Sequence, residues 1–428
     1  MKDTTRRYTR RGVVAWCLYD WGNSAFSTII LTFVFAAYFT EKIAINKVLG
    51  MAQWARAIAI AGLIIAVISP FLGAIADHEG RRKPWIAGFA AVSILSAALL
   101  WFAKPMPSFV TWTLVWLAVG VIGLEVSVVF YNAMLRDLAP DHYVGRISGW
   151  AWGVGYLGGL CSLLLVLWIF INGNWRWAWL DNSMSESIRL CGPLVAIWYA
   201  VFALPLFIWT PDTPSRGVRF KTAIQLGLKQ LLHTLHTLPS YKEILKFLLA
   251  RMLYIDGLNT IFAFGGIYAA GTLGMNFTQL IEFGIAMNVA AGIGAIGFAW
   301  VDDWIGAKTT IIIALCVMLV SGTLMLLAHR PLLFWIFGMF LCLCVGPVQA
   351  ASRSLMVHLV PPHLVNEMFG LYAFSGKVTA FVGPWLVSIF TLQFDSQRVG
   401  MSTVMLMLLL GTLMLCFVKE PTARPSLS

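Results

Sequence analysis

The sequence predicts an all-α membrane protein whose twelve transmembrane helices form two pseudosymmetric six-helix bundles. Three observations lead to this fold class: charges are few, apolar stretches are long, and motifs recur in order along the chain. Of the 428 residues, 59% are hydrophobic and 11% are charged, whereas an average soluble domain is about 25% charged. So small a charged fraction cannot cover a water-facing surface, and the apolar excess excludes a disordered chain.

Each predicted span is an apolar stretch long enough to cross the hydrocarbon core as a helix, which takes roughly 20 residues. The stretches lack the alternating pattern of an outer-membrane barrel, which excludes strands. The first stretch is too long for a cleaved signal peptide, and Asp20 and Asn23 interrupt it. The spans are expected at about residues 14–39, 54–76, 84–103, 109–134, 148–171, 190–210, 246–271, 280–300, 308–328, 332–356, 366–391 and 399–418.

The distribution of lysine and arginine predicts how the chain is oriented. With the N-terminus in the cytoplasm, the cytoplasmic loops hold nineteen of these residues and the opposite loops hold seven. Basic residues concentrate on the cytoplasmic side of membrane proteins. We therefore expect both termini to lie on the cytoplasmic side of the membrane. Nucleic acid is not an expected partner, because the net charge of +11 is not gathered in a water-facing domain.

The longest polar interruption, residues 211–245, separates spans six and seven. Pro211 and Pro214 end the preceding helix. Apolar residues then recur at helical spacing opposite Lys221 and Lys229, which predicts an amphipathic helix on the inner membrane surface; a solvated linker is the alternative. We expect bundles at residues 1–210 and 246–428, joined by a cytoplasmic linker at 211–245. The apolar stripe comprises Phe220, Ile224, Leu228, Leu231, Leu232 and Leu235.

Three motifs of the first half recur in order in the second. They are an Asp-x-x-Asn-x-x-Phe pattern, an Asp-x-x-Gly pattern, and a proline followed by glycines nine and fifteen residues later. Parallel repeats of this kind indicate two halves that can rock against each other around a central site. The motifs begin at Asp20 and Asp256, at Asp77 and Asp303, and at Pro140 and Pro361, with offsets of 236, 226 and 221 residues.

The stretch from Gly73 to Lys83, GAIADHEGRRK, resembles the signature between helices two and three of the major facilitator superfamily of transporters. The resemblance implies a cytoplasmic latch, in which Asp77 pairs with Arg81 or with a neighbouring helix end. In the second half Ala299 replaces the leading glycine, so we expect the latch there to be degenerate.

Three further stretches resemble the vacuole-effluxer-like branch of that superfamily, typified by fungal autophagy-related amino-acid effluxers and their bacterial relatives. They are YDWGNSAF at 19–26, FYNA at 130–133 with GYLGG at 155–159, and the segment from QAASRS at 349–354 through FGLY at 369–372 to Lys377.

Charged side chains within apolar spans are costly and therefore candidates for function. Asp20 and Asp256 occupy matching places in spans one and seven, which line the central cavity in the superfamily that the chain resembles. Each could carry a proton, because desolvation favours the neutral form of a carboxyl group. Alternatively each could bind the opposite half through hydrogen bonds, with Asn23 or Asn259 beside it. Glu125, in span four, needs a partner or a proton.

Two basic residues complete the candidates. Lys377, near the membrane midplane in span eleven, could anchor a substrate carboxylate or neutralise Glu125, Asp20 or Asp256. Gln349 and Arg353 lie one helical turn apart in span ten. Arg353 could clamp an anionic group or, like Asp77 and Arg81, belong to the cytoplasmic gate.

The leading prediction is a monomeric secondary transporter that moves a small organic solute by alternating access, coupled to protons. The family resemblance suggests an amino-acid-like solute. Transport of a lipid or amphiphile, and ligand sensing without transport, are the alternatives. We expect no enzyme activity, cofactor or metal, because no nucleophile-and-base pattern, metal cluster or phosphate loop stands out in the sequence.

Overall fold

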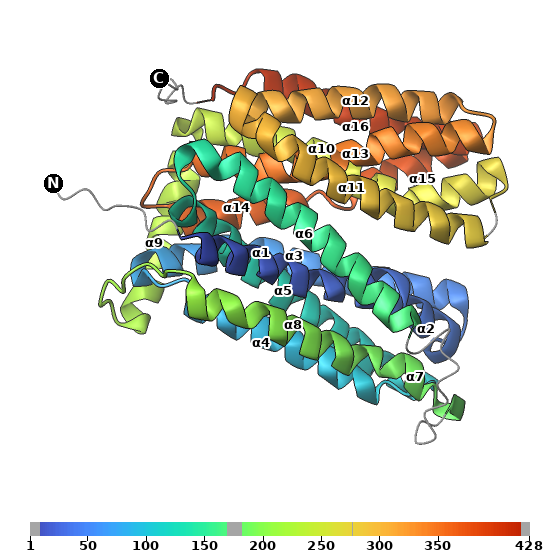
Figure 1. The fold of residues 1–428 in the computed structure, drawn as a ribbon, viewed down its shortest axis with the longest axis horizontal. Coiled ribbons are helices and arrows are strands. Elements are labelled where there is room, and N and C mark those ends of the chain that lie inside the picture. The colour runs from blue at the N-terminus through green and yellow to red at the C-terminus, as the bar shows by residue number, and fades with distance from the viewer. Residues whose placement is uncertain (1–8, 169–181, 276, 421–428) are drawn as a thin grey trace.

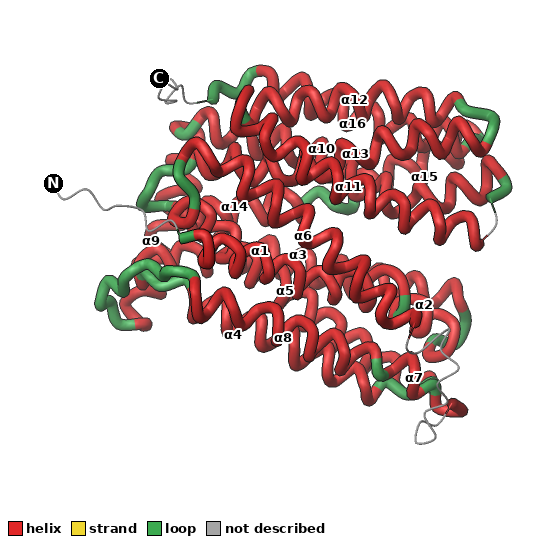
Figure 2. The backbone as a smooth tube through the Cα atoms, viewed as in Figure 1, coloured by secondary structure: helices red, strands yellow, loops and turns green. Residues whose placement is uncertain are grey.

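The computed structural model describes residues 9–168, 182–275 and 277–420, and in these ranges the chain is helical without strands. Twelve helical stretches among them are long and apolar enough to cross a membrane, in agreement with the sequence prediction (Figures 1 and 2). The chain is thus a multi-pass integral membrane protein.

The first half of the chain contributes six of these spans. Its helices are α1 (Arg10–Ala25), the π-helical η1 (Phe26–Phe33), α2 (Phe35–Tyr38), the π-helical η2 (Phe39–Ile43), α3 (Lys47–Glu79), α4 (Lys83–Leu99), η3 (Leu100–Phe102), η4 (Pro107–Phe109), α5 (Val110–Leu138), η5 (Asp141–Tyr143), α6 (Val144–Val166), η7 (Asn182–Met184), α7 (Glu186–Arg189) and α8 (Cys191–Trp209).

The linker helix α9 is followed by the six spans of the second half. Its helices are α9 (Phe220–Thr237), η8 (Leu238–Ser240), α10 (Lys242–Leu273), α11 (Phe277–Ile305), α12 (Ala307–Leu327), α13 (Pro331–Leu359), α14 (Val365–Lys377), α15 (Val382–Phe394) and α16 (Gln397–Cys416).

Two matching pairs of helices join the halves: α3 packs along α14, and α6 packs along α11. Figure 1 shows α6 beside α11 between the two groups of helices. The close approach requires small residues. A Cβ atom on Gly73 would lie 2.3 Å from the carbonyl oxygen of Asn366, and one on Gly149 would lie 2.5 Å from the Cβ of Ala299. These glycines bring the backbones of the two halves into contact.

Two spans are interrupted. The first changes from α- to π-helix at Phe26; π-helical segments are frequent at functional sites. The eleventh breaks at residues 378–381, between α14 and α15, partway along the span (Figure 2). Non-helical backbone at membrane depth is tolerated where it is buried in protein or lines a cavity.

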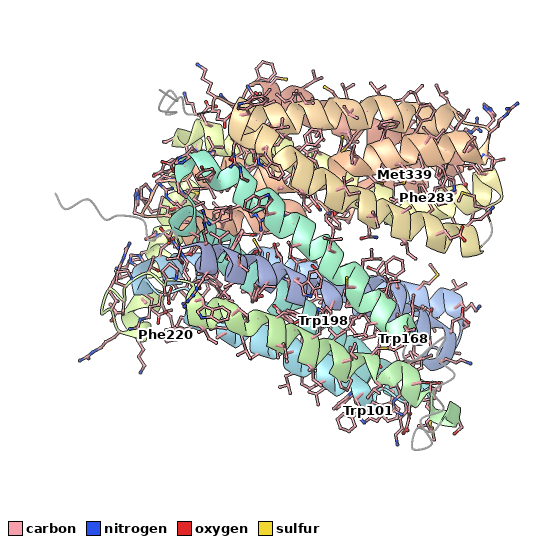
Figure 3. The ribbon with its side chains drawn as sticks, viewed as in Figure 1. Trp101, Trp168, Trp198, Phe220, Phe283 and Met339 are labelled. Carbon is pink, nitrogen blue, oxygen red and sulfur yellow. The ribbon has the colours of Figure 1, made fainter. Side chains whose placement is uncertain are left out.

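The linker contains the predicted helix, α9, and its protein-facing side is distinct from the apolar stripe expected on the membrane surface. Small residues make the contact: Ala223 and Thr234 are buried, and Gly227 packs against Ile75 of α3. Phe220, Leu228 and Leu232 of the stripe stay exposed, and Figure 3 shows Phe220 at the start of α9. The side chain of Leu235 lies outside the described part. Leu228 and Leu232 therefore point away from the bundle, whereas Ile224 and Leu231 are half-buried and the Phe220 ring lies 6.2 Å from the Trp85 ring of α4.

Candidate functional site

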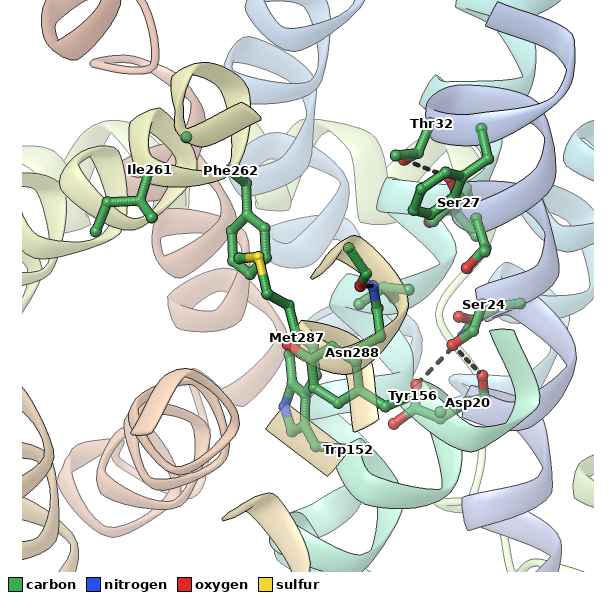
Figure 4. Close-up of a pocket in the computed structure, with 18 of the residues that line it drawn as sticks. Asp20, Ser24, Ser27, Thr32, Trp152, Tyr156, Ile261, Phe262, Met287 and Asn288 are labelled. Carbon is green, nitrogen blue, oxygen red and sulfur yellow. Dashed lines mark hydrogen bonds between the residues drawn. The ribbon is translucent and has the colours of Figure 1, made fainter. Parts of the chain in front are cut away.

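A cavity of about 540 Å³ lies between the two halves. Residues of the first span, including Ser24, Ser27 and Thr32, line one side, and Phe262 and Met287 of α10 and α11 line the other (Figure 4). The π-helical turn places hydroxyl groups on the cavity side, and the Thr32 hydroxyl donates to the carbonyl oxygen of Ser27 over 2.9 Å. Hydroxyl groups of the first span thus line one side of the cavity, and the lining from α10 and α11 is mainly apolar, with Asn288 as a polar exception.

Arg353 of α13 enters the first half and is only 2% exposed. Its guanidinium donates to the hydroxyl and carbonyl oxygens of Ser148 on α6 over 2.9 and 2.7 Å. It also donates to Asn132 on α5 over 3.1 Å, and its Nη1 lies 3.5 Å from the Asp20 carboxylate on α1. The Trp16 ring lies 4.8 Å from the guanidinium carbon. These contacts place Arg353 in a bridge between the halves, at one end of the cavity.

Asp20 is therefore both a cavity-lining residue and part of this bridge. Its other carboxylate oxygen accepts a hydrogen bond from Asn23 over 3.2 Å. Gln349, one turn before Arg353, forms a second polar contact between the halves, because its Oε1 accepts from the Tyr156 hydroxyl over 2.7 Å. The structure brings Asp20, Asn23, Gln349 and Arg353 to the same end of the cavity.

Lys377 forms an ion pair with Glu125 across the halves, with 2.7 Å between Nζ and Oε1. Glu125 lines the cavity. The two side chains are 29% and 32% exposed, so the pair is only partly buried, and Lys377 itself is not among the residues that line the cavity. Lys377 is thus paired with Glu125, which is one of the three acids that it was expected to neutralise.

Asp256 and Asn259 do not line the cavity, in contrast to Asp20 and Asn23. Asp256 is 1% exposed, and its Oδ2 accepts from the backbone amide of Gly383 in α15 over 3.1 Å. Asn259 is exposed. The sequence repeat placed the two aspartates at matching positions, but α15 rather than the opposite half faces Asp256.

Asp77 binds the start of α14 in the opposite half. Its carboxylate accepts from the backbone amides of Asn366 and Glu367 over 3.1 and 2.9 Å and from the Asn366 side chain over 2.8 Å. A helix leaves its first amide groups unsatisfied and carries partial positive charge there. Asp77 therefore caps a helix of the other half, which is the second of the two partners expected for it.

The basic partner expected in this latch is corrected from Arg81 to Arg82. Arg81 is exposed and takes no part in the contact. Arg82 is 6% exposed, donates to the Asn366 side chain over 2.8 Å and forms an ion pair with Asp137 of α5. Adjacent arginines of one loop point to different sides, and the sequence carries no signal that separates them.

The matching latch of the second half is not degenerate. Asp303 accepts from the backbone amide of Arg146 at the start of α6 over 3.1 Å and pairs with the Arg146 guanidinium over 3.1 Å. The alanine at 299 still fits, because Gly149 faces it. The small residue that this close contact requires is Gly149 on α6, and residue 299 of α11 can therefore be alanine.

Three further polar residues of the site were not singled out: Asn132, Ser148 and Asn366. Asn132 stands in the FYNA stretch, which marked family resemblance without a role. Within the described residues, no group of three or more His, Cys, Asp or Glu side chains is placed to hold a metal ion.

Comparisons with known proteins agree with this architecture. A sequence model of the family described as "Vacuole effluxer Atg22 like" matches residues 51–427. The "Uncharacterized MFS-type transporter YxiO" of Bacillus subtilis (strain 168) is 27% identical over 98% of this chain and 97% of its own length. "Autophagy-related protein 22" of Coccidioides immitis (strain RS) is 21% identical over 81% of this chain and 69% of its own length.

Solved structures share the fold. The proton:xylose symporter XylE superposes with a TM-score of 0.75 and 15% identity, covering 96% of both chains. The major facilitator superfamily transporter FucP, in its outward conformation, superposes with a TM-score of 0.74 and 13% identity, covering 96% of this chain and 99% of that one.

The two neighbouring arginines provide a test of the latch. Arg82→Ala should lower the free energy of unfolding by about 2–3 kcal/mol, because it removes buried hydrogen bonds to a charged group. Arg81→Ala, the matched control, should stay within about 0.5 kcal/mol of the wild type. Thermal unfolding of the purified protein in detergent measures both changes. Equal effects of the two substitutions would contradict the assignment of Arg82.

The ion pair between Lys377 and Glu125 can be measured with a double-mutant cycle of Lys377→Met and Glu125→Gln. Because the pair is partly exposed, its coupling should be about 0.5–1 kcal/mol and not the roughly 3–5 kcal/mol lost on breaking a fully buried pair. Thermal unfolding of the two single variants and the double variant gives the coupling. Additive effects would show that the contact contributes nothing.

Proposed function

The chain belongs to the Atg22-like vacuole effluxer family of major facilitator transporters, and from this premise we propose that it moves a small, amino-acid-like solute coupled to protons. That it is a transporter and not an enzyme follows from its relatives and structural neighbours. The nature of the solute and the coupling are our proposal. Alternating access carries the solute from one side to the other.

The observation that carries the proposal is a central cavity whose closure depends on separable polar contacts. The bridge of Arg353 and the latches of Asp77 and Asp303 all join the halves at the end that bears the start of α1 and the end of α16. The cavity residues Thr32 and Phe33 lie further along the first span, toward the other end. Breaking the contacts at one end and forming others at the opposite end would reverse access.

The two walls of the cavity support an amphipathic zwitterion as the solute. A volume of about 540 Å³ suits a small organic molecule, since ligand pockets measure roughly 300–1,000 Å³. The partly exposed pair of Glu125 and Lys377 offers a carboxylate to an ammonium group and an ammonium to a carboxylate. The apolar wall at Phe262 and Met287 would receive the side chain of an amino acid.

Three carboxyl groups within the spans support proton coupling: Asp20, Glu125 and Asp256. Placing an ionisable side chain in a membrane costs free energy, so such residues are candidates for function. The structural neighbour XylE is itself a proton:xylose symporter. We propose further that the protein is a monomer of the bacterial plasma membrane. Its expected bundles are residues 1–210 and 246–428 with the cytoplasmic linker 211–245, and each chain has its own cavity.

A binding screen followed by counterflow tests the transport proposal. Purified protein is heated with single amino acids, peptides, organic acids or lysolipids. A ligand present at about 100 times its dissociation constant should add about 2.7 kcal/mol of stability. An amino acid such as leucine is expected to stabilise the protein and, as the labelled compound, to exchange across proteoliposomes. Binding without exchange would indicate a receptor, and stabilisation by lysolipids alone would indicate an amphiphile transporter; either result contradicts the proposal.

Cysteine labelling tests the orientation. In a variant whose exposed cysteines Cys161, Cys316 and Cys416 are replaced by serine, Ser215→Cys should resist an impermeant maleimide added to intact cells. Lys104→Cys, in the loop between α4 and α5 on the opposite side, should react, which makes it the matched control. The expectation follows from the excess of basic residues around Ser215. Labelling of Ser215→Cys from outside would refute a cytoplasmic linker.

A further inference from the structure

Of the three carboxyl groups proposed above for proton coupling, two are neutralised by a basic side chain of the opposite half, and the third is not. Asp20 lies 3.5 Å from Arg353, and Glu125 lies 2.7 Å from Lys377. Asp256, although the most deeply buried at 1% exposed, is paired with no basic side chain among the described residues. A buried carboxylate without a cation is costly, so a different group must balance it.

The group that faces Asp256 is the broken span eleven. Residues 378–381 interrupt the helix, and α15 begins anew at Val382. The Asp256 Oδ2 accepts from the amide of Gly383 over 3.1 Å. One turn earlier on α10, the Met252 carbonyl oxygen accepts from the Thr379 hydroxyl of the break over 3.4 Å. The break in span eleven is therefore held against α10 on both sides of its turn.

The other oxygen of Asp256, Oδ1, is buried and accepts no hydrogen bond among the described residues. It points to the same place as the Thr260 hydroxyl: a Cβ atom on Gly383 would lie 2.0 Å from Thr260 Oγ1 and 3.2 Å from Asp256 Oδ1. The Thr260 hydroxyl donates to the Asp256 backbone carbonyl over 2.7 Å. The unpartnered oxygen Oδ1 thus lies near the positively polarised start of α15. A side chain larger than glycine at position 383 would collide with the Thr260 hydroxyl beside it.

The charged side chains on α10 and on the helices packed against it are bound elsewhere or lie at helix ends, and the remaining ionisable groups there are tyrosines and thiols. Within the described residues, α15 carries none. The others are Lys242, Glu243 and Lys246 at the start of α10, Arg251 (bound to Tyr372 and Ser375 of α14), Tyr254 (bound to Ser352) and Tyr268 (bound to Leu326), with Glu367 (bound to Gln230), Tyr372 (under the Arg251 guanidinium) and Lys377 (bound to Glu125) on α14, Cys342, Cys344, Arg353 (bound to Asp20) and His358 on α13, Arg398 and Cys416 on α16, and Glu282, Asp302 and Asp303 on α11.

We propose that Asp256, at the break of span eleven, is the proton-binding carboxyl group of the transport cycle. The proposal refines the proton coupling proposed above and rests on it. Hydronium transfers a proton to Oδ1, which gives a neutral carboxyl group and water, and no electron is transferred. A site built from one free carboxylate oxygen suits a proton, because a metal cation requires several oxygen ligands.

Protonation at this position has a mechanical consequence. The ionised carboxylate is stabilised by the amide groups and partial positive charge at the start of α15, and the neutral acid loses most of that attraction. With the proton on Oδ1, Oδ2 becomes a carbonyl oxygen that accepts more weakly from the Gly383 amide, so one of the two contacts of the break with α10 weakens. Lys377, the last residue of α14, directly precedes the break and holds Glu125 in the other half. A proton on Asp256 would thereby loosen an ion pair between the halves.

Infrared difference spectroscopy of the purified full-length protein, titrated from high to low pH without any solute, tests the site directly. A protonated carboxyl group in a dry environment gives a C=O stretching band distinct from that of a carboxylate. We expect a pH-dependent band that is absent in Asp256→Asn and retained in Asp20→Asn and Glu125→Gln. Asp256→Glu, which keeps the carboxyl group, should retain the band at a shifted midpoint and excludes misfolding as the cause of its loss.

Several outcomes would overturn the proposal. They are the absence of any such band in the wild type, its persistence in Asp256→Asn, and its loss in Asp20→Asn or Glu125→Gln with Asp256 intact. Proteoliposomes then separate this inference from the transport proposal. Asp256→Asn should abolish accumulation of labelled leucine driven by a pH gradient and leave leucine counterflow intact. If the wild type shows no counterflow, the transport proposal fails, whereas the infrared result for Asp256 stands.

Discussion

The burial of one guanidinium group determines how the two halves close. Removing an arginine side chain from water is strongly unfavourable unless nearly all its donors are satisfied. Arg353 meets this requirement only with groups from α1, α5 and α6 of the opposite half. No arrangement within its own half supplies them among the described contacts. The closed end is therefore a condition for the stability of this side chain, and separation of the halves must provide it with water or with other partners.

The recurring motifs in the sequence predicted two matching halves, because apolar patterns and short motifs can be recognised from local spacing alone. It did not predict the partner of each motif. Asp77 and Asp303 bind backbone amides of the opposite half, and any residue type can present an amide. The same limit explains the correction from Arg81 to Arg82, since side-chain direction at a loop depends on the packing of the adjoining helix.

The matching aspartates illustrate a second limit. Asp20 and Asp256 follow the same local motif, yet Asp20 lines the cavity and Asp256 faces α15. Asp256 meets the break in span eleven, and residues 378–381 contain no glycine or proline that would have indicated this break. Likewise the linker helix was predicted from its apolar stripe, but it contacts the bundle through alanine, glycine and threonine. Such contacts are set by available space rather than by hydrophobicity.

The two halves line the cavity with different side chains, so each half would select a different property of the solute. The hydroxyl and carboxylate groups come from the first half, and the lining from α10 and α11 of the second half is mainly aromatic and aliphatic. During a rocking motion the polar head of a solute would travel with one half while its tail slides along the other. Changes in α10 and α11 would then alter the size of solute accepted without altering the functional groups recognised. The size of the solute and its functional groups would then be selected by different halves, so substitutions could change one without changing the other.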